Sequence, residues 1–214
     1  MKKSSSSRDK LIAVARDLII ERGFSAMSVG AVCAAAAVTK GSFFHHFSTK
    51  EALGEAVLEQ FWSDVQDRQS KASYQHAGDP FEKLLGYIDH AIEIYQDPVI
   101  RKGCLLAVFT SELRETQPNL FMKCVPHFIA WKTDLEALLQ EAAAYCQPIN
   151  PWIPSAWAEL YISALEGALI LARALNDPKV ITRVLTLFRA QLSNVFPDAE
   201  AVDVNAPAPK ANLL

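Results

Sequence analysis

Residues 28–47 read SVGAVCAAAAVTKGSFFHHF, and this stretch predicts two short helices joined by a tight turn. Ser28 and Thr39 each stand where a hydroxyl can cap the first turn of a helix. The helices are therefore expected at about 28–36 and 39–46, with small residues between them that allow close packing. A helix-turn-helix of this kind can place its second helix in the major groove of DNA.

The second of these helices carries groups suited to DNA on its outer side and at its N-terminus. Hydroxyl groups at a helix N-terminus favour phosphate, because the free backbone N–H groups and the helix dipole act in the same direction. Lysines add charge, and serine or histidine can reach base edges. We expect Phe44 and Phe47 to anchor the inner side of the helix. The predicted DNA-binding residues are Ser28, Thr39, Lys40, Gly41, Ser42, Phe43, His45, His46 and Lys50.

Charge is distributed unevenly along the chain. Residues 1–50 contain eight Lys or Arg and three acidic residues, a net charge of +5, whereas the whole chain has −3, so the remainder sums to −8. This asymmetry favours phosphate contact by the first part alone. A solvated charged face is the other interpretation, and charge by itself does not separate the two.

The rest of the chain shows helical periodicity and no alternating strand pattern. Asp-Pro pairs at residues 79–80, 97–98 and 177–178 each predict a helix start, since Asp accepts hydrogen bonds from first-turn N–H groups and proline needs none. Pro126 predicts a kink or a fresh start. The polar run 69–78 predicts a linker. Further helices are expected at about 49–68, 80–96, 98–116, 118–146, 154–175 and 178–195.

These patterns predict an all-α chain of about nine helices in two domains. A three-helix DNA-binding domain is expected at residues 8–68 and a larger helical domain at 79–196. Composition predicts disordered tails at 1–7 and 197–214.

From Arg8 to Leu58 the chain resembles the TetR family of transcriptional regulators. The resemblance rests on Arg22-Gly23-Phe24, on AAVTKGSFFHHF at 36–47 and on Thr49-Lys-Glu-Ala-Leu53, at fixed spacing over about fifty residues. Two positions depart from the family pattern: Ala37 replaces a turn glycine, and Phe44-His45 replaces a Tyr-Tyr pair. Ala37 would be mildly strained in a left-handed turn, and both departures argue against transferring a known operator.

The resemblance implies a dimeric repressor that binds a palindromic operator and is released by a small-molecule effector. In the family the last two helices form a four-helix dimer bundle with their mates. Small residues in 154–175 and an apolar stripe in 178–195 fit that role, while a monomer using both helices in its own core is the alternative. The residues predicted at the dimer interface are Ala164, Ala168, Leu171, Ile181, Leu185, Phe188 and Leu192.

In the family, helices of the second domain enclose an effector pocket. Seven residues are candidates for this pocket, because polar or aromatic groups there interrupt apolar surroundings, and two or three of them are expected to line it. Cys104 is expected to be a passive wall rather than a reactive thiol. The candidates are Cys104, Phe109, Glu112, Phe128, Trp131, Tyr161 and Glu166.

Other classes fit less well. No nucleophile–base pair, metal set or phosphate-binding glycine loop is spaced for catalysis, so neither an enzyme, a metal nor a cofactor is expected. A helical adaptor that binds another protein is the main alternative, but it would not need the basic first fifth. Residues 156–175 carry too much charge for a membrane span, and the N-terminus lacks the apolar segment of a secretory signal, so a cytoplasmic protein is expected.

Overall fold

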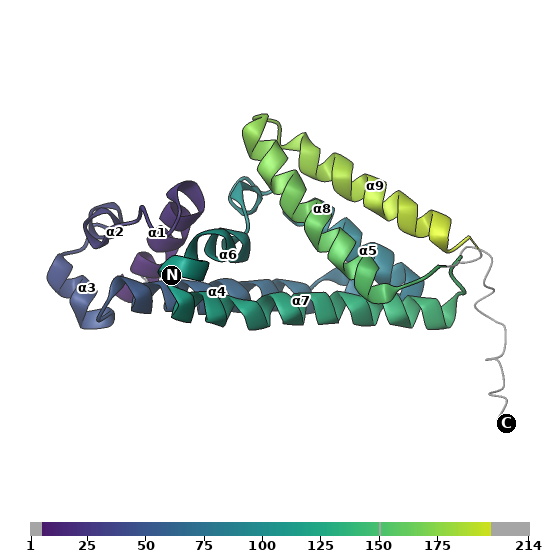
Figure 1. Cartoon of the computed structure of the whole chain (residues 1–214), viewed down its shortest axis with the longest axis horizontal. Coiled ribbons are helices and arrows are strands. Elements are labelled where there is room, and N and C mark those ends of the chain that lie inside the picture. Colours follow the sequence, from purple (N-terminus) through teal and green to yellow (C-terminus); the bar gives the residue numbers. More distant parts are fainter. Residues whose placement is uncertain (1–5, 150, 198–214) are drawn as a thin grey trace, which may run out of the picture.

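The computed structural model describes residues 6–149 and 151–197, which form an elongated all-helical molecule without strands (Figure 1). The predicted all-α architecture, an N-terminal helix-turn-helix followed by a larger helical domain, is confirmed. The helices are α1 (Ser7–Arg22), α2 (Val29–Ala36), α3 (Lys40–His46), α4 (Lys50–Ser70), η1 (Ser73–His76), α5 (Pro80–Ile94), η2 (Ile100–Lys102), α6 (Leu105–Thr116), α7 (Pro118–Tyr145), α8 (Pro154–Ala174) and α9 (Lys179–Val195).

Hydroxyl caps define the starts of the first helices. Ser6 and Asp9 form a reciprocal capping box at α1, so residues 6 and 7 belong to this helix and not to a tail. Of the predicted C-terminal tail, 197–214, only Pro197 is described. Residues 1–5 and 198–214 lie outside the described residues. Thr39 Oγ1 accepts a hydrogen bond from the backbone N–H of Ser42 at 3.1 Å. These local bonds fix where the helices begin at the end of the molecule that carries the predicted helix-turn-helix, here called the DNA-binding end.

The turn between α2 and α3 has the left-handed geometry expected from the sequence. Ala37 adopts φ 54° and ψ 45°, a conformation that glycine reaches without steric cost and alanine does not. Its N–H lies 3.3 Å from the Ala34 carbonyl oxygen, and the next N–H, of Val38, donates to the Cys33 carbonyl at 3.0 Å. The turn is therefore closed by backbone bonds in spite of its residue type.

Two long helices run along the length of the molecule, α4 from the DNA-binding end and α7 beside it (Figure 1). Helix α7 continues through Pro126, so no fresh start occurs there. Proline removes the donor to the carbonyl four residues earlier, which belongs to Met122. Met122 is exposed, and water can therefore satisfy that carbonyl.

The segment before α6 differs from the sequence prediction. A helix was expected from Pro98, but residues 98–104 form a turn, the short helix η2 and an extended Gly103 with φ 153°. Asp97 still accepts the N–H of Val99 at 2.7 Å. The Asp-Pro pair therefore starts only a short turn, and α6 begins at Leu105.

Residues 69–78 are also more than a linker. They contain η1, in which Tyr74 is buried against α5. A Cβ atom on Gly86 would lie 2.7 Å from the Tyr74 Cβ, so the glycine allows α5 to approach this residue closely. One aromatic side chain anchors a segment whose polar composition predicted a loop.

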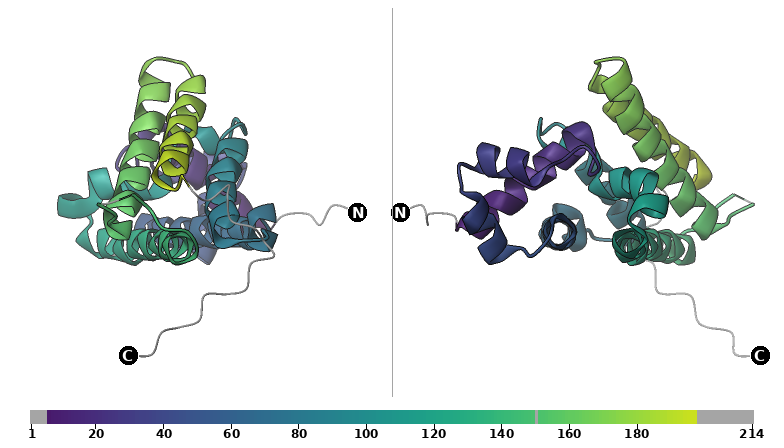
Figure 2. Two further views of the ribbon diagram at one scale, coloured as in Figure 1. Left: turned by 90° about the vertical axis from the view of Figure 1, so that its right-hand side faces the viewer. Right: turned by 60° about the vertical axis from the view of Figure 1, so that its left-hand side comes forward.

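Helices α8 and α9 form an antiparallel pair that projects from the body of the molecule (Figure 2). Helix α9 packs on α5 and α8, and α8 packs on α7. Among the described helices, α8 is the one long and apolar enough by length and composition to cross a membrane. This is weak support for a membrane span, because core helices of soluble proteins share these properties.

Candidate DNA-reading face and ligand cavity

Helix α3 turns one phenylalanine inward and its neighbour outward. Phe43 is 0% exposed and packs on Phe47 with a ring-centroid distance of 5.9 Å, whereas Phe44 is 56% exposed. The prediction that Phe43 faces DNA and Phe44 anchors the helix is therefore wrong. The inward positions are 43 and 47, because α3 packs against α1 and α2 on that side.

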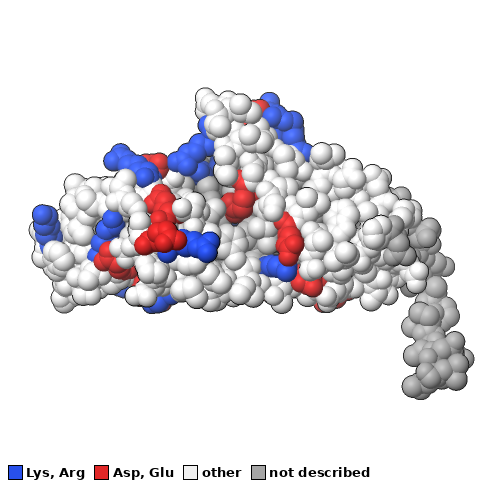
Figure 3. Space-filling view, viewed as in Figure 1, with Lys and Arg blue, Asp and Glu red and all other residues white. Residues whose placement is uncertain are grey.

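The remaining predicted DNA-binding residues lie on the outer surface at the α2–α3 end of the molecule. Ser28, Thr39, Lys40, Gly41 and His45 are exposed, and Ser42 and His46 are half-buried. Figure 3 shows Lys and Arg side chains at this end of the molecule. This face combines hydroxyls, imidazoles, an ammonium group and one exposed aromatic ring.

Lys50 has a structural partner in addition to its predicted phosphate contact. Its Nζ donates to the Ser25 carbonyl at 3.2 Å and lies 4.6 Å from the centroid of the Phe24 ring. The half-buried ammonium thereby fixes the loop between α1 and α2 against the start of α4. A phosphate contact by Lys50 stays a prediction.

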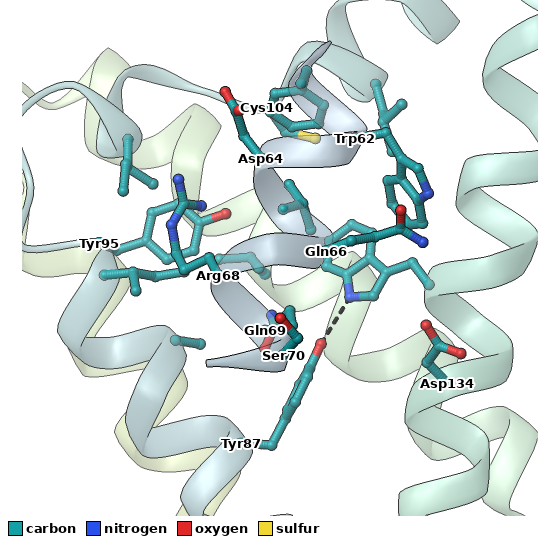
Figure 4. Close-up of a pocket in the computed structure, with 18 of the residues that line it drawn as sticks. Trp62, Asp64, Gln66, Arg68, Gln69, Ser70, Tyr87, Tyr95, Cys104 and Asp134 are labelled. Atoms are coloured by element: carbon teal, nitrogen blue, oxygen red, sulfur yellow. Dashed lines mark hydrogen bonds between the residues drawn. The ribbon is translucent and has the colours of Figure 1, made fainter. Parts of the chain in front are cut away.

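A cavity of about 510 Å³ lies mainly among the helices from α5 to α9, which form the second region of the chain (Figure 4). Its walls come from α4, α5, α7 and α8, with the segment before α6 on one side. Helix α1 also contributes, through Arg16 and Ile20. The volume is suited to a small organic molecule.

Three of the seven predicted pocket residues line this cavity: Cys104, Trp131 and Tyr161. The other four do not line it; two or three of the seven were expected to do so. Phe109 is fully buried against Phe24, with ring centroids 5.6 Å apart.

Phe128 stacks on the wall residue Trp131 from outside the cavity, with ring centroids 6.2 Å apart. Glu112 reaches the loop after α1, where its Oε2 accepts from the Ser25 N–H at 3.1 Å. Glu166 lies behind Cys104 rather than in the wall. Sequence reasoning identified polar and aromatic interruptions correctly but could not tell a cavity wall from the layer behind it.

Several wall residues were missed by sequence reasoning, because they lie on α4, in the supposed linker and on α5. A helical wheel for α4 places Arg68 near the apolar face that contains Leu53 and Val57, and this was the available signal. The missed polar and aromatic wall residues include Trp62, Arg68, Gln69, Tyr74, Tyr87, Tyr95 and Asp134.

A hydrogen-bonded aromatic cluster forms the inner wall of the cavity. Trp131 Nε1 donates to the Tyr87 hydroxyl at 2.9 Å, shown as the dashed line in Figure 4. The Tyr161 hydroxyl is a second hydrogen-bonding neighbour of Tyr87. Burial raises the pKa of Tyr87 well above its usual range, so these phenols are neutral and act as hydrogen-bonding groups.

Cys104 is buried and paired with a carboxyl group. Burial raises the pKa of its thiol well above the usual range, and the adjacent Glu166 adds to the increase. Burial likewise raises the pKa of Glu166, whose Oε1 has no hydrogen-bond partner among the described residues. A neutral thiol is a poor nucleophile, which favours Cys104 as a passive wall.

Side chains of the second region hold the C-terminal end of α1. Arg173, on α8, donates to the carbonyls of Ile20 and Glu21 at 3.0 and 2.9 Å. Lys102 forms an ion pair of 3.2 Å with Glu21. Because Ile20 also lines the cavity, the cavity wall and the DNA-binding end share a helix.

Most residues predicted at a dimer interface are buried inside this chain instead. Ala168, Ile181, Leu185, Phe188 and Leu192 belong to its own core, and that part of the prediction is wrong. The apolar stripe of α9 meets α5 and α8, which periodicity alone could not distinguish from a partner. Of the other two, Ala164 is half-buried and Leu171 is 50% exposed.

Comparisons with known proteins agree with this architecture. The family described as "Bacterial regulatory proteins, tetR family" matches residues 11–57, and "Tetracyclin repressor-like, C-terminal domain" matches residues 80–188. The second match alone covers just over half of the chain.

Two relatives with similar sequences are named as transcriptional repressors. The HTH-type transcriptional repressor DhaR of Mycobacterium sp. (strain GP1) is 27% identical over 84% of this chain and 89% of its own length. The HTH-type transcriptional repressor NemR of Escherichia coli (strain K12) is 29% identical over 53% of this chain and 57% of its own.

Solved structures show the same fold. A TetR-family regulator from Agrobacterium tumefaciens has a TM-score of 0.78 at 23% identity, covering 89% of this chain and 97% of its own. The reduced form of E. coli NemR has a TM-score of 0.70 at 22% identity, with the same coverage of both chains. With its helix-turn-helix, its helical second region and matches to both family domains, the chain belongs to the TetR family of bacterial transcriptional regulators.

Proposed function

We propose that this protein is a dimeric repressor that binds a palindromic operator and releases it when a small molecule occupies the cavity. The observation that carries the proposal is the outer face of α3. It presents Lys40, Phe44 and His45 to solvent, while Phe43 and Phe47 hold the helix in the domain core. A recognition helix needs this combination of a fixed inner side and a free outer side.

Direct contacts are assigned by chemistry. Lys40 and the hydroxyl of Thr39 are placed for phosphate, at the N-terminus of α3. His45 can hydrogen-bond a base edge, and the exposed ring of Phe44 can pack on a thymine methyl group. Ser28, Gly41, Ser42 and His46 remain proposed contacts at the edges of this face. Phe44 replaces Phe43 in the set.

Dimerisation is proposed through the outward sides of α8 and α9. Large apolar side chains are exposed there, and the face over α8 in Figure 3 shows few charged residues. Nothing lies within 4 Å of the position that a Cβ on Gly167 would occupy, so a second helix can approach α8 closely. The proposed interface residues are Leu160, Ala164, Gly167, Ile170, Leu171 and Leu187.

Release is proposed to act through α1. A ligand in the cavity would contact Ile20, which lies one residue from Glu21 and its ion pair with Lys102. Movement of α1 carries the helix-turn-helix with it and changes the spacing of the two recognition helices. A ligand shifts this equilibrium only if it binds the non-DNA-binding arrangement more tightly. The repressors DhaR and NemR support repression in the bacterial cytoplasm.

The test is selection from a random library of double-stranded DNA with the full-length protein. The expected result is enrichment of an inverted repeat whose half-sites lie one helical turn, or a multiple of it, apart, roughly 34–36 Å per turn. A Lys40→Ala, His45→Ala double variant should lose this enrichment and keep its helical content. Recovery of no shared sequence by the wild type would contradict operator binding. Recovery of a single unrepeated half-site would contradict the dimer.

A further inference from the structure

The charged residues around the cavity leave one unpaired cation. Arg16 pairs with Asp64 at 3.4 Å, and Lys83 pairs with Glu141 at 3.1 Å. Arg68 has no ion-pair partner within the described part of the chain. A half-buried guanidinium without an anion is the group in the cavity that would stabilise a negatively charged ligand most strongly.

Arg68 is directed toward the aromatic side of the cavity. It extends from α4 on the same side as Tyr95, and its charge acts on the Tyr95 hydroxyl (Figure 4). That hydroxyl has no acceptor among the described residues. The guanidinium supplies only hydrogen-bond donors, and the phenol hydroxyl can add one more donor.

Tyr87 offers a further donor. Its hydroxyl oxygen receives Trp131 Nε1 at 2.9 Å and has the Tyr161 hydroxyl as a second neighbour. The Tyr87 hydroxyl already accepts from Trp131, which leaves its own proton to donate to a ligand. The ligand group that meets Tyr87 must therefore be an acceptor, such as an ether, carbonyl or carboxylate oxygen.

One unpaired anion, Asp134, also lines the cavity, on the opposite side of the view in Figure 4. Asp134 is exposed, so water competes with a ligand for its carboxylate. Burial of part of the carboxyl raises its pKa. Asp134 is therefore a weaker determinant than the half-buried Arg68, and it does not oppose an anion held beside Tyr95.

We propose that the cavity binds a small aromatic carboxylate. The carboxylate pairs with Arg68 and accepts from Tyr95, the aromatic body lies among Trp131, Tyr161 and the other ring side chains, and an acceptor on that body meets Tyr87. This inference rests on the proposed function, because it names the class of effector for the same cavity.

Three matched probes test the charge requirement: para-phenoxybenzoate, its neutral amide para-phenoxybenzamide and its cationic counterpart para-phenoxybenzylamine. All share an ether oxygen as an acceptor for Tyr87. Titration calorimetry on the full-length protein should show the carboxylate binding about 10- to 100-fold more tightly than the amide, with the amine weakest. Equal affinity of acid and amide, or no binding by the acid, would overturn the proposal.

Variants of cavity residues identify the side chain that causes the preference for the carboxylate over the amide. Arg68→Gln should reduce the acid-to-amide ratio to about one while amide binding persists, and Arg68→Lys should keep part of the preference. Lys83→Gln is the matched control, because it removes a cation of the cavity that is already paired with Glu141. Tyr87→Phe should weaken the acid and the amide alike, by about 2- to 10-fold. An unchanged ratio in a folded Arg68→Gln protein would assign the anion to another residue and overturn the inference.

Operator binding separates this inference from the function on which it rests. In gel-shift titrations the acid should release wild-type protein from its selected operator at concentrations that leave Arg68→Gln bound. A protein that binds its operator as a dimer but shows no carboxylate preference refutes the ligand class alone. A protein that selects no operator refutes the regulator.

Discussion

Two pairs of adjacent residues show how the two regions of the molecule differ. On α3, Phe43 is 0% exposed and Phe44 is 56% exposed; on α9, Phe188 is 6% exposed and Leu187 is 63% exposed. Each pair has one buried and one exposed member. The surroundings of the exposed member differ, since Phe44 is flanked by polar residues of α3, whereas Leu187 belongs to a helix that packs on α8, which exposes large apolar side chains of its own.

This difference supports the proposal that the two surfaces bind different partners. A single ring within a polar, basic face fits a groove that is lined with phosphates and offers a few methyl groups. A broader apolar surface with few charges fits another protein. The following substitutions compare buried and exposed neighbours within each region.

The largest effect is expected from a charge at Phe188. Phe188→Asp buries an unpaired carboxylate in the core between α8 and α5 and should cost more than about 4 kcal/mol of unfolding free energy. Leu187→Asp is the matched variant: it should leave the helical content of the subunit intact but yield monomers in sedimentation. Folded monomers of Phe188→Asp, or dimers of Leu187→Asp, would place the interface elsewhere.

A second pair of substitutions divides stability from DNA binding in α3. Phe43→Ala should destabilise the DNA-binding end by about 3–5 kcal/mol, because a fully buried ring is lost. Phe44→Ala should change stability by no more than about 0.5 kcal/mol yet weaken operator binding about 5- to 100-fold. Chemical denaturation and gel-shift titration measure the two effects. Normal operator affinity in Phe44→Ala would remove this ring from the interface.

The two lysines of this end should differ in their response to salt. Lys40 is exposed, and Lys40→Ala should flatten the slope of log affinity against log salt by about one unit. Lys50→Ala should flatten it as well only if Lys50 contacts phosphate in addition to Ser25. An unchanged slope with lower thermal stability in Lys50→Ala would assign this side chain to the loop alone.

The smallest effect concerns Glu166. Burial raises the pKa of this carboxyl in the folded protein above its ordinary 4.5. The unfolded chain therefore loses the proton first, and the wild type loses stability as pH rises from about 4.5 through the folded pKa. Glu166→Gln has no ionisable group here and does not lose this stability. Its thermal midpoint should therefore rise further above that of the wild type as the pH increases. Parallel curves for the two proteins over the pH series would contradict the assignment.

Local signals made the DNA-binding end predictable. The hydroxyls of Ser28 and Thr39 cap their helices as expected, and the left-handed residue falls at Ala37. The inward and outward phenylalanines were nevertheless exchanged. The motif predicts the helix and its N-cap, whereas the side that becomes buried depends on packing against α1 and α2.

The second region was less predictable because long-range packing decides it. The periodicity of α9 is the same whether its stripe meets α5 or a second subunit. The polar composition of residues 69–78 concealed Tyr74, which depends on the close approach permitted by Gly86. A cavity wall assembled from α1, α4, α5, α7 and α8 has no signature within any one segment.

The contact between Gly23 and Glu112 has a consequence for the evolution of regulation. A Cβ at residue 23 would coincide with the Glu112 carboxylate, and the glycine has φ 85°, so any side chain would displace the acid that accepts the Ser25 N–H. Residue 23 therefore couples α6 to the loop that leads into the helix-turn-helix. In a related protein with the same recognition helix, a change at this position alone would alter how α6 holds that loop, while the proposed DNA contacts and the cavity wall keep their residues.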